Sequence, residues 1–152
     1  MKILQELSIR DLMTDSVVTL TTEDTVDQVA AIFEKNDFHH IPILNRDEEV
    51  VGMISRTDLE CISAGMSNFT NTQKESYNHA LHRSLRTVDI MSKDVITLDA
   101  GDSVQSIYTI FRLNRIRAIP IVRKKKLLGL VTPFDLIEGL VVKSCLRSPS
   151  SS

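Results

Sequence analysis

The chain has 152 residues, of which 42% are hydrophobic and 25% are charged, values typical of a globular protein with one compact core. No run approaches the roughly 18 apolar residues of a membrane span, and the N-terminus lacks signal-peptide features, so we predict a cytoplasmic protein without membrane contact. The net charge of −2 conceals an asymmetry, because residues 7–60 hold 12 acidic and 4 basic side chains, whereas residues 87–143 hold 6 and 9. An anionic ligand should therefore be held better by the second half.

The sequence contains an internal repeat. Residues 11–47 align with residues 89–125 without a gap, and 13 of these 37 paired positions are identical. Ordinary residue frequencies would give about 6%, or about two identities. After one deleted residue, the alignment resumes with Gly52/Gly129, Asp58/Asp135 and Leu59/Leu136. A repeat of this length predicts two similar structural units.

Each repeat predicts the same elements in the same order. A short opening turn (11–14 and 89–92) precedes a strand rich in Val, Ile and Thr (16–20 and 94–98). A helix follows, with Thr25 and Gln28 in the capping-box pattern and Ser103 at the same place in the second repeat. Apolar residues then recur with the helical period: Val26, Val29, Ala30 and Phe33, and Val104, Ile107, Tyr108 and Phe111.

A second strand follows at 40–44 and 118–122. Its central proline removes a donor from the strand ladder, so we expect an edge position or a bulge there. The remaining elements complete the order β-α-β-β-α: polar turns (45–48, 123–126), third strands (50–55, 127–132) and helices that begin at residues 56 and 133. Between the repeats, 67–72 predicts a loop and 73–85 could form a helix.

One such unit leaves an apolar sheet face uncovered, and two stacked units would cover it. We therefore predict an α+β fold in which two β-α-β-β-α motifs pack face to face by their small sheets, with pseudo-twofold symmetry and two related clefts. The predicted divisions are motif 1 at 7–64, a linker at 65–86, motif 2 at 87–145 and a disordered tail at 146–152.

The spacing Gly-x-x-Ser/Thr-x-x-Asp occurs twice where a strand ends and a helix begins, as Gly52/Ser55/Asp58 and Gly129/Thr132/Asp135. A structural interpretation treats the hydroxyl as an N-cap and the Asp as a favourable charge near the helix N-terminus. A functional interpretation uses the helix N–H groups and the hydroxyl to bind a phosphate, and the carboxylate to accept hydrogen bonds from ribose hydroxyls. In that interpretation the glycines permit close backbone approach to a ligand.

These motifs together resemble tandem cystathionine β-synthase (CBS) domains, the Bateman module, of the stand-alone bacterial type. The resemblance covers residues 7–143 and rests on four further segments: Asp-Leu-Met-Thr (11–14), Asp-Ile-Met-Ser (89–92), His-Ile-Pro-Ile (40–43) and Ala-Ile-Pro-Ile (118–121). It implies a non-catalytic regulatory module that binds AMP, ADP or ATP, with S-adenosylmethionine or NAD as alternatives. It also implies a homodimer and an effector protein whose identity is unknown.

The resemblance implies a role for particular residues. Asp58 and Asp135 would hold the ribose, and Ser55 and Thr132 would lie near the phosphate. Backbone of the first strands and of the apolar-Pro segments would frame the base: Val17, Val18, Ile41 and Pro42, and Val95, Ile96, Ile119 and Pro120. The residue three before the proline, which contacts phosphate in kinase-regulating relatives, is His39 in repeat one and Arg117 in repeat two.

The two predicted sites differ in charge. Histidine is mostly neutral at pH 7 and is therefore a weaker counter-charge for phosphate than arginine. We expect unequal affinities, with the Arg117 site the tighter one.

Other functions have weaker support in the sequence. His39, His40, His79 and His82 have no thiol or carboxylate at a metal-ligand spacing, so no metal site is predicted. The basic run 123–126 lacks an accompanying nucleic-acid motif, and neither a nucleophile–base pair nor a phosphate-binding loop is present, so neither nucleic-acid binding nor catalysis is predicted. The alternative kept open is a dimerising scaffold whose clefts are empty.

Overall fold

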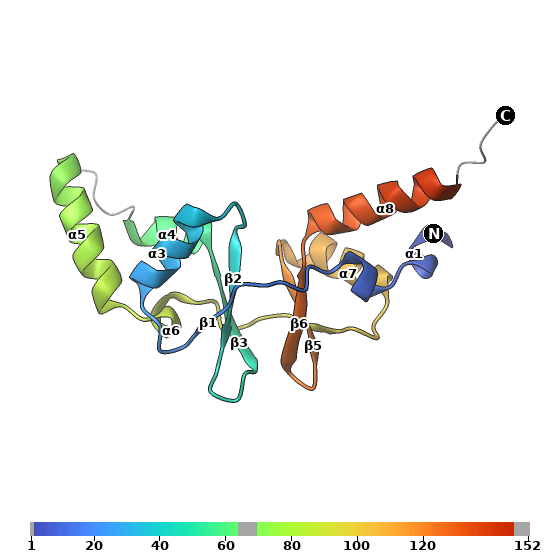
Figure 1. Cartoon of the computed structure of the whole chain (residues 1–152), viewed down its shortest axis with the longest axis horizontal. Helices are drawn as coiled ribbons and strands as arrows, with labels where there is room; N and C mark the ends of the chain where they lie inside the picture. The colour runs from blue at the N-terminus through green and yellow to red at the C-terminus, as the bar shows by residue number, and fades with distance from the viewer. Residues whose placement is uncertain (1, 64–69, 148–152) are drawn as a thin grey trace. The chain divides into compact units, whose positions relative to one another are not determined.

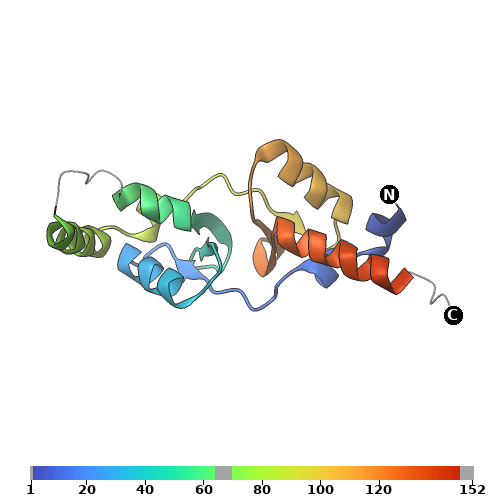
Figure 2. The same cartoon turned by 90° about the horizontal axis from the view of Figure 1, so that it is seen from above.

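The computed structural model describes residues 2–63 and 70–147, and the chain divides into two compact units. Unit 1 comprises Met1–Val17 and Ile96–Ser152, and unit 2 comprises Val18–Val95. Each unit contains one three-stranded sheet with two helices on the same side of it, α3 and α4 in unit 2 and α7 and α8 in unit 1 (Figure 1 and Figure 2). The predicted α+β class with two small sheets is confirmed.

Both units contain the elements that the repeats predict. Those of unit 2 are β1 (Leu20–Thr21), α3 (Val26–Lys35), β2 (His40–Leu44), β3 (Val50–Ser55), α4 (Arg56–Ser63), α5 (Asn71–Ser84) and α6 (Thr87–Ile90). Those of unit 1 are α1 (Lys2–Glu6), α2 (Ile9–Leu12), β4 (Leu98–Asp99), α7 (Val104–Asn114), β5 (Ile119–Arg123), β6 (Lys126–Val131) and α8 (Pro133–Arg147).

The sheets have the order β1-β2-β3 and β4-β5-β6, with the first pair parallel and the second antiparallel. The short β1 pairs only with Ile43 and Leu44, so Pro42 lies beyond its end with β3 as its single neighbour. The register also shifts between Ile43 and Leu44. The expectation that the proline segment is a local edge or a bulge is therefore confirmed, and it follows from the missing N–H of proline.

Two predicted elements differ from the structure. The first strands, predicted at 16–20 and 94–98, are confined to Leu20–Thr21 and Leu98–Asp99, because only these residues find a partner strand. The opening turns are short helices, α2 and α6. Residues 67–69 of the predicted 67–72 loop lie outside the described residues, whereas Asn71 and Thr72 already belong to α5. Helix α8 continues to Arg147 and so enters the predicted tail at 146–152.

The two units exchange the short helices that open the repeats. Helix α2 opens the first repeat but packs in unit 1, where Ile9 is fully buried in the core. Helix α6 opens the second repeat but packs in unit 2, where Thr87 is fully buried. Each compact unit therefore combines the opening helix of one repeat with the sheet of the other.

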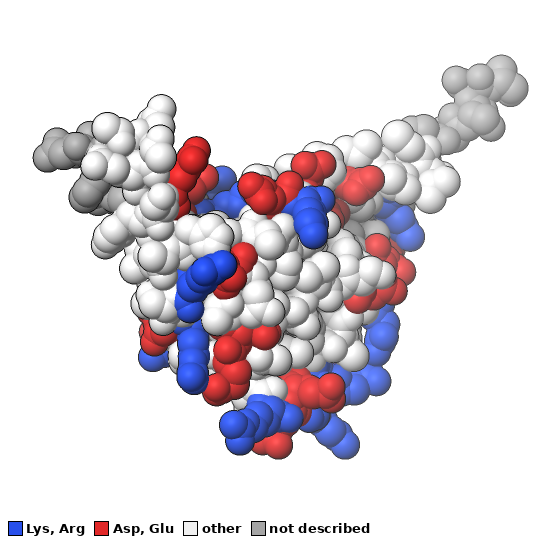
Figure 3. Space-filling view, turned by 60° about the vertical axis from the view of Figure 1, so that its left-hand side comes forward, with Lys and Arg blue, Asp and Glu red and all other residues white. Residues whose placement is uncertain are grey.

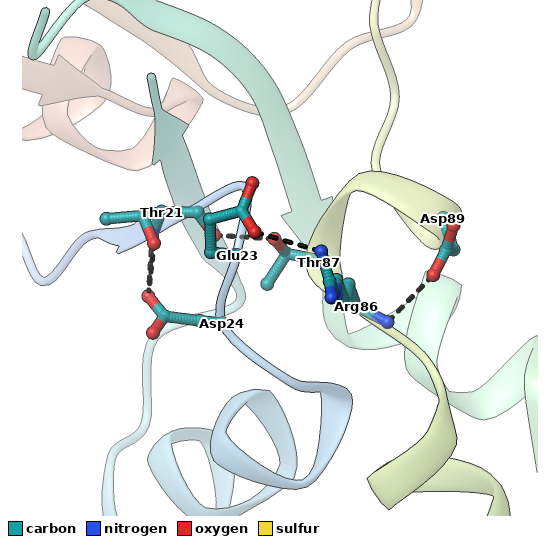
Figure 4. A network of polar contacts seen from close by, with 6 residues as sticks. All are labelled: Thr21, Glu23, Asp24, Arg86, Thr87 and Asp89. Atoms are coloured by element: carbon teal, nitrogen blue, oxygen red, sulfur yellow. Dashed lines mark hydrogen bonds and ion pairs between the residues drawn. The ribbon is translucent and has the colours of Figure 1, made fainter. Parts of the chain in front are cut away.

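Polar contacts fasten α6 to the loop between β1 and α3 (Figure 4). The Thr87 hydroxyl donates to the Thr21 carbonyl at 2.6 Å, and the Thr87 N–H donates to the Asp24 carbonyl at 2.8 Å. The Arg86 guanidinium forms an ion pair with Glu23 at 2.9 Å. The buried threonine thus has both polar groups satisfied, as burial requires.

Each unit has its own apolar core. The core of unit 2 is formed by one face of α3 and the inward residues of β2 and β3: Val29, Phe33, Ile41, Ile43 and Ile54. The core of unit 1 adds the residues of α2 to the same arrangement: Ile9, Leu12, Ala100, Val104, Ile107, Ile119, Ile121, Val131 and Leu136. These cores hold the strand-to-helix junctions that carry the repeated motif.

Candidate functional site

The first junction joins β3 to α4 through Ser55. The Ser55 N–H donates to Asp58 Oδ2 at 2.7 Å, and the Asp58 N–H donates to Ser55 Oγ at 3.1 Å. This reciprocal pair is the capping-box arrangement, which satisfies two N–H groups that a helix start otherwise leaves unpaired. The local sequence therefore fixes the hydroxyl and the carboxylate next to each other at the start of α4.

The second junction joins β6 to α8 through Thr132 and has nearly the same geometry. The Thr132 N–H donates to Asp135 Oδ2 at 2.7 Å, and the Thr132 hydroxyl donates to the same oxygen at 2.8 Å. The Asp135 N–H reaches Thr132 Oγ1 at 3.4 Å. Pro133 occupies the first helical position, where its missing N–H costs nothing.

The capping bonds leave part of each junction open. Each of Asp58 and Asp135 uses only its Oδ2 in hydrogen bonds with the described residues, so its Oδ1 remains an acceptor. Within the described residues, the N–H groups of Thr57 and Phe134 also have no acceptor. A carboxylate oxygen and a free N–H at a helix N-terminus can accept from a ribose hydroxyl and donate to an anion.

The motif glycines have a structural role that the sequence did not reveal. A Cβ at Gly52 would lie 2.2 Å from Met91 Sδ, and a Cβ at Gly129 would lie 2.7 Å from the Thr14 carbonyl oxygen. The segment after α6 or α2 therefore fills the space beside each glycine. Close approach at both glycines is required by the chain itself, and the approach of a ligand to them stays a prediction.

The remaining predicted site residues divide between the two units. Val18, His39, Ile41, Pro42 and Val95 lie in unit 2 with Ser55 and Asp58, and Val17, Ile96, Arg117, Ile119 and Pro120 lie in unit 1 with Thr132 and Asp135. The side chains of Ile41 and Ile119 are fully buried in the cores. A ligand could therefore meet only their backbone, and their role in framing a base stays a prediction.

In unit 2, the residue before the proline segment lies at the helix start. His40 pairs with Ser55, and the Arg56 N–H donates to the His39 carbonyl at 3.0 Å. Ile119 pairs with Val131 at the start of β5, and Arg117 lies two residues before this strand. Both His39 and Arg117 are exposed, and Arg117 forms no ion pair or hydrogen bond with the described residues.

Arg56 is a residue that the sequence analysis missed. Its Nε donates to the Phe38 carbonyl at 3.0 Å, and its Nη2 donates to the carbonyls of Phe33, at 2.6 Å, and Asn36. Its guanidinium also lies 5.0 Å from the centroid of the Phe33 ring. Arg56 thereby ties the start of α4 to the C-terminal end of α3. The unpaired carbonyls and the helix dipole at the C-terminal end of α3 favour a cation.

Two weaker interpretations find no support among the residues that the structure describes. No group of three or more His, Cys, Asp or Glu side chains there could hold a metal ion. Helix α5 turns His82 towards the protein, where loss of solvation lowers the pKa of its imidazole. On the face drawn in Figure 3, acidic and basic side chains alternate, so that face offers no continuous basic field for a nucleic acid.

None of the helices in the described part of the chain combines the length and apolar character that a membrane crossing requires.

Two small α+β units, each with a hydroxyl–carboxylate pair at a strand-to-helix junction, define a tandem-repeat module. The CBS domain family model matches residues 9–60 and 88–142. The chain belongs to the CBS domain family, whose domains are generally regulatory and non-catalytic.

Comparison with known sequences and structures supports this assignment. An uncharacterised protein of Methanocaldococcus jannaschii, MJ1426, is 28% identical, over 88% of this chain and 90% of its own. The CBS domain of a CBS domain-containing membrane protein from Sphaerobacter thermophilus has a similar structure, with a TM-score of 0.75, 27% identity and coverage of 90% and 91%. CBSX2, solved in complex with AMP, shares the fold at 14% identity, with a TM-score of 0.74 and coverage of 89% and 97%.

Proposed function

We propose that this chain is a non-catalytic cytoplasmic sensor that binds an adenine nucleotide of the AMP, ADP or ATP class and signals to a partner protein. The ribose is held by Asp58 and Asp135, and the phosphate lies near Ser55 and Thr132. The observation that carries the proposal is the duplicated junction, in which each carboxylate keeps one oxygen open beside an unpaired helix N–H. AMP binding by a protein of this fold, CBSX2, supports the choice of ligand class.

The experiment is thermal unfolding with AMP, ADP and ATP. A ligand at 100 times its dissociation constant adds about 2.7 kcal/mol of stability, which raises the melting temperature of a chain of this size by about 5–10 °C. The shift should shrink in Asp58→Ala and in Asp135→Ala and vanish in the double variant. Asp89→Ala, which removes the capping carboxylate of α6, should retain the full shift relative to its own ligand-free melting temperature.

S-adenosylmethionine and NAD belong in the same experiment as alternative ligands. A shift with one of these, and none with AMP, ADP or ATP, would replace the nucleotide in the proposal. A nucleotide shift that survives in the double variant would move the site elsewhere in the chain.

A second function, a dimerising scaffold with unoccupied sites, is favoured by one observation. In both capping boxes the hydroxyl and the carboxylate already form hydrogen bonds with backbone N–H groups of the same helix start. Their repetition could therefore be explained by helix capping alone. No melting shift with any of the five compounds would support the scaffold.

We also propose that the protein forms a homodimer, on the basis of helix α8. Its inner face holds Leu136, which is buried in the unit 1 core, and Gly139, which packs against Leu12. Its outer face is apolar as well, since Phe134 is 71% exposed, Ile137 57% and Val141 56%. A contiguous exposed apolar patch of this kind is typical of a protein–protein contact, so the outer face calls for a second protein surface.

Replacing Ile137 with Glu should separate the dimer. The first repeat already has Glu60 at the equivalent position of α4, so the fold accepts this residue there. Light scattering during size exclusion should give twice the chain mass of 17.1 kDa for the wild type and about one chain mass for the variant. Thr72→Glu, an equal charge change on exposed α5, should remain dimeric. A monomeric wild type would contradict the proposal.

A further inference from the structure

The turn between β5 and β6 carries four consecutive positive charges, and we call residues 123–126 the basic hairpin. Arg123 and Lys126 pair across the two strands, and Lys124 and Lys125 form the turn between them. All four side chains are exposed, and the first three have no side-chain hydrogen bond or ion pair with residues that the structure describes. The turn lies at the end of β6 opposite to Thr132, about 20 Å away at the rise of a strand, and projects past α7 and α8 (Figure 1).

The backbone of this turn does not suit lysine. Lys124 and Lys125 both lie in the left-handed region, with φ of 48° and 67°. A two-residue hairpin turn of this kind favours Asn-Gly or Gly-Gly, because the left-handed region brings Cβ close to a carbonyl oxygen. Arg123 also lies directly opposite Lys126, and like charges in a cross-strand pair repel each other. The local sequence therefore opposes the conformation that the hairpin adopts.

The equivalent turn of the first repeat is stabilised by its own side chains. Asn45, which aligns with Arg123, accepts hydrogen bonds at its Oδ1 from the N–H groups of Asp47 and Glu49, both at 2.9 Å. Within residues 45–49, only Glu48 has a positive φ. The fold thus accepts ordinary turn chemistry at this place, and the second repeat has four cations there instead.

The acidic residues at this end of the sheet are bound to the backbone of their own loop. Asp99 pairs with Val122, just before the basic hairpin, and its Oδ1 accepts the Gly101 N–H at 2.8 Å. Asp102 Oδ2 accepts the Asp99 N–H at 2.8 Å. Neither carboxylate forms an ion pair with Arg123 or with the two turn lysines. Three cations of the basic hairpin therefore have no counter-charge within their unit.

Unfavourable residues at a place where favourable ones fit indicate a function beyond folding. We infer that the basic hairpin binds an acidic segment of another protein. Carboxylates on neighbouring residues of such a segment form charge-assisted hydrogen bonds with lysine and arginine. The hairpin has no aromatic side chain on which a nucleic-acid base would stack, and no exposed apolar side chain that would enter a membrane. The inference is independent of nucleotide binding at the two junctions.

The test is fluorescence anisotropy of a labelled oligoglutamate peptide with the full chain. Exposed ion pairs are weakened by salt, so the peptide should bind at about 0.01 M ionic strength and lose at least about tenfold in affinity at about 0.1 M, where the screening length falls from about 30 to about 10 Å. No binding at the lower ionic strength would overturn the inference. Tighter binding of single-stranded DNA of equal charge, or of vesicles of anionic lipid, would replace the acidic segment as the partner and so also overturn it.

Repair of the turn separates binding from folding. Lys124→Asn combined with Lys125→Gly restores the favoured turn residues, so the variant should melt a few degrees above the wild type while its affinity for the peptide falls at least about tenfold. Lys124→Arg combined with Lys125→Arg keeps the charge and should keep the affinity.

The matched control removes two charges elsewhere. Lys35→Asn combined with Lys93→Asn changes two exposed lysines of unit 2 and should alter the affinity less than about twofold, the size of effect expected when no direct contact is lost. Peptide binding by the repaired turn at the wild-type affinity would overturn the inference. So would a repaired turn that melts no higher than the wild type, since the lysines would then carry no cost to explain.

Discussion

A fragment of residues 18–95 is expected to fold and to melt cooperatively, whereas a fragment of residues 7–64 is expected to remain unfolded. The shorter fragment holds the whole first repeat as its sequence defines it. It lacks α6, however, which opens the second repeat and completes the core and the backbone pairing of unit 2.

The contacts that the shorter fragment loses are extensive. Ile90 and Met91 pack on the unit 2 core, and Ser92 exchanges two backbone hydrogen bonds with Met53, at 2.9 and 3.1 Å. The Val26 N–H, at the first position of α3, also loses the Leu85 carbonyl at 2.9 Å. Burying or exposing one large apolar side chain changes stability by about 1.5–3 kcal/mol, and a small domain has only about 5–15 kcal/mol in total.

Circular dichroism and urea titration of both fragments measure this difference. Thr87→Ala in the 18–95 fragment provides the matched control, because it removes the hydroxyl bond to Thr21 and keeps the rest of α6. That variant should fold with a lower urea midpoint. A cooperative transition in the 7–64 fragment, equal to that of 18–95, would show that α6 is dispensable.

The exchange of opening helices marks a limit of what the repeat could predict. Hydrophobic period and capping residues indicate α3, α7 and the three strands of each unit, because these signals lie within a dozen neighbouring residues. The Asp-x-Met segments also align well, but alignment of two copies cannot state which sheet each segment packs against. That choice depends on Gly52 and Gly129, whose missing side chains admit Met91 and Met13 from the other repeat.

The candidate site also contains contacts that the sequence could predict and contacts that it could not. Both hydroxyl–carboxylate pairs were predictable, since a capping box joins residues only three apart. Arg56 was not, because its partners are backbone carbonyls 18 to 23 residues away, and any residue type offers a carbonyl. The sequence did show that the two repeats differ here, with Arg56 in the first and Pro133 in the second. Only the structure shows that Arg56 binds the carbonyls at the end of α3.

Replacing Arg56 with Met is expected to destabilise unit 2 by about 3 kcal/mol, because a charged donor contributes about 1.5–3 kcal/mol per hydrogen bond and the freed carbonyls are only partly buried. Met keeps the aliphatic contact with Phe33 but lacks donors for the carbonyls at the end of α3. For a chain of this length the melting temperature should fall by about 10 °C.

Arg46→Met supplies the control, since Arg46 is an exposed arginine in the turn between β2 and β3 of the same unit. Its melting temperature should stay within about 1–2 °C of the wild type, as for surface substitutions in general. If Arg56→Met behaved like this control, the three carbonyl contacts would contribute little, and Arg56 would be available to a ligand. The difference between the two variants therefore measures how firmly the carbonyls at the end of α3 hold the Arg56 guanidinium away from the first site.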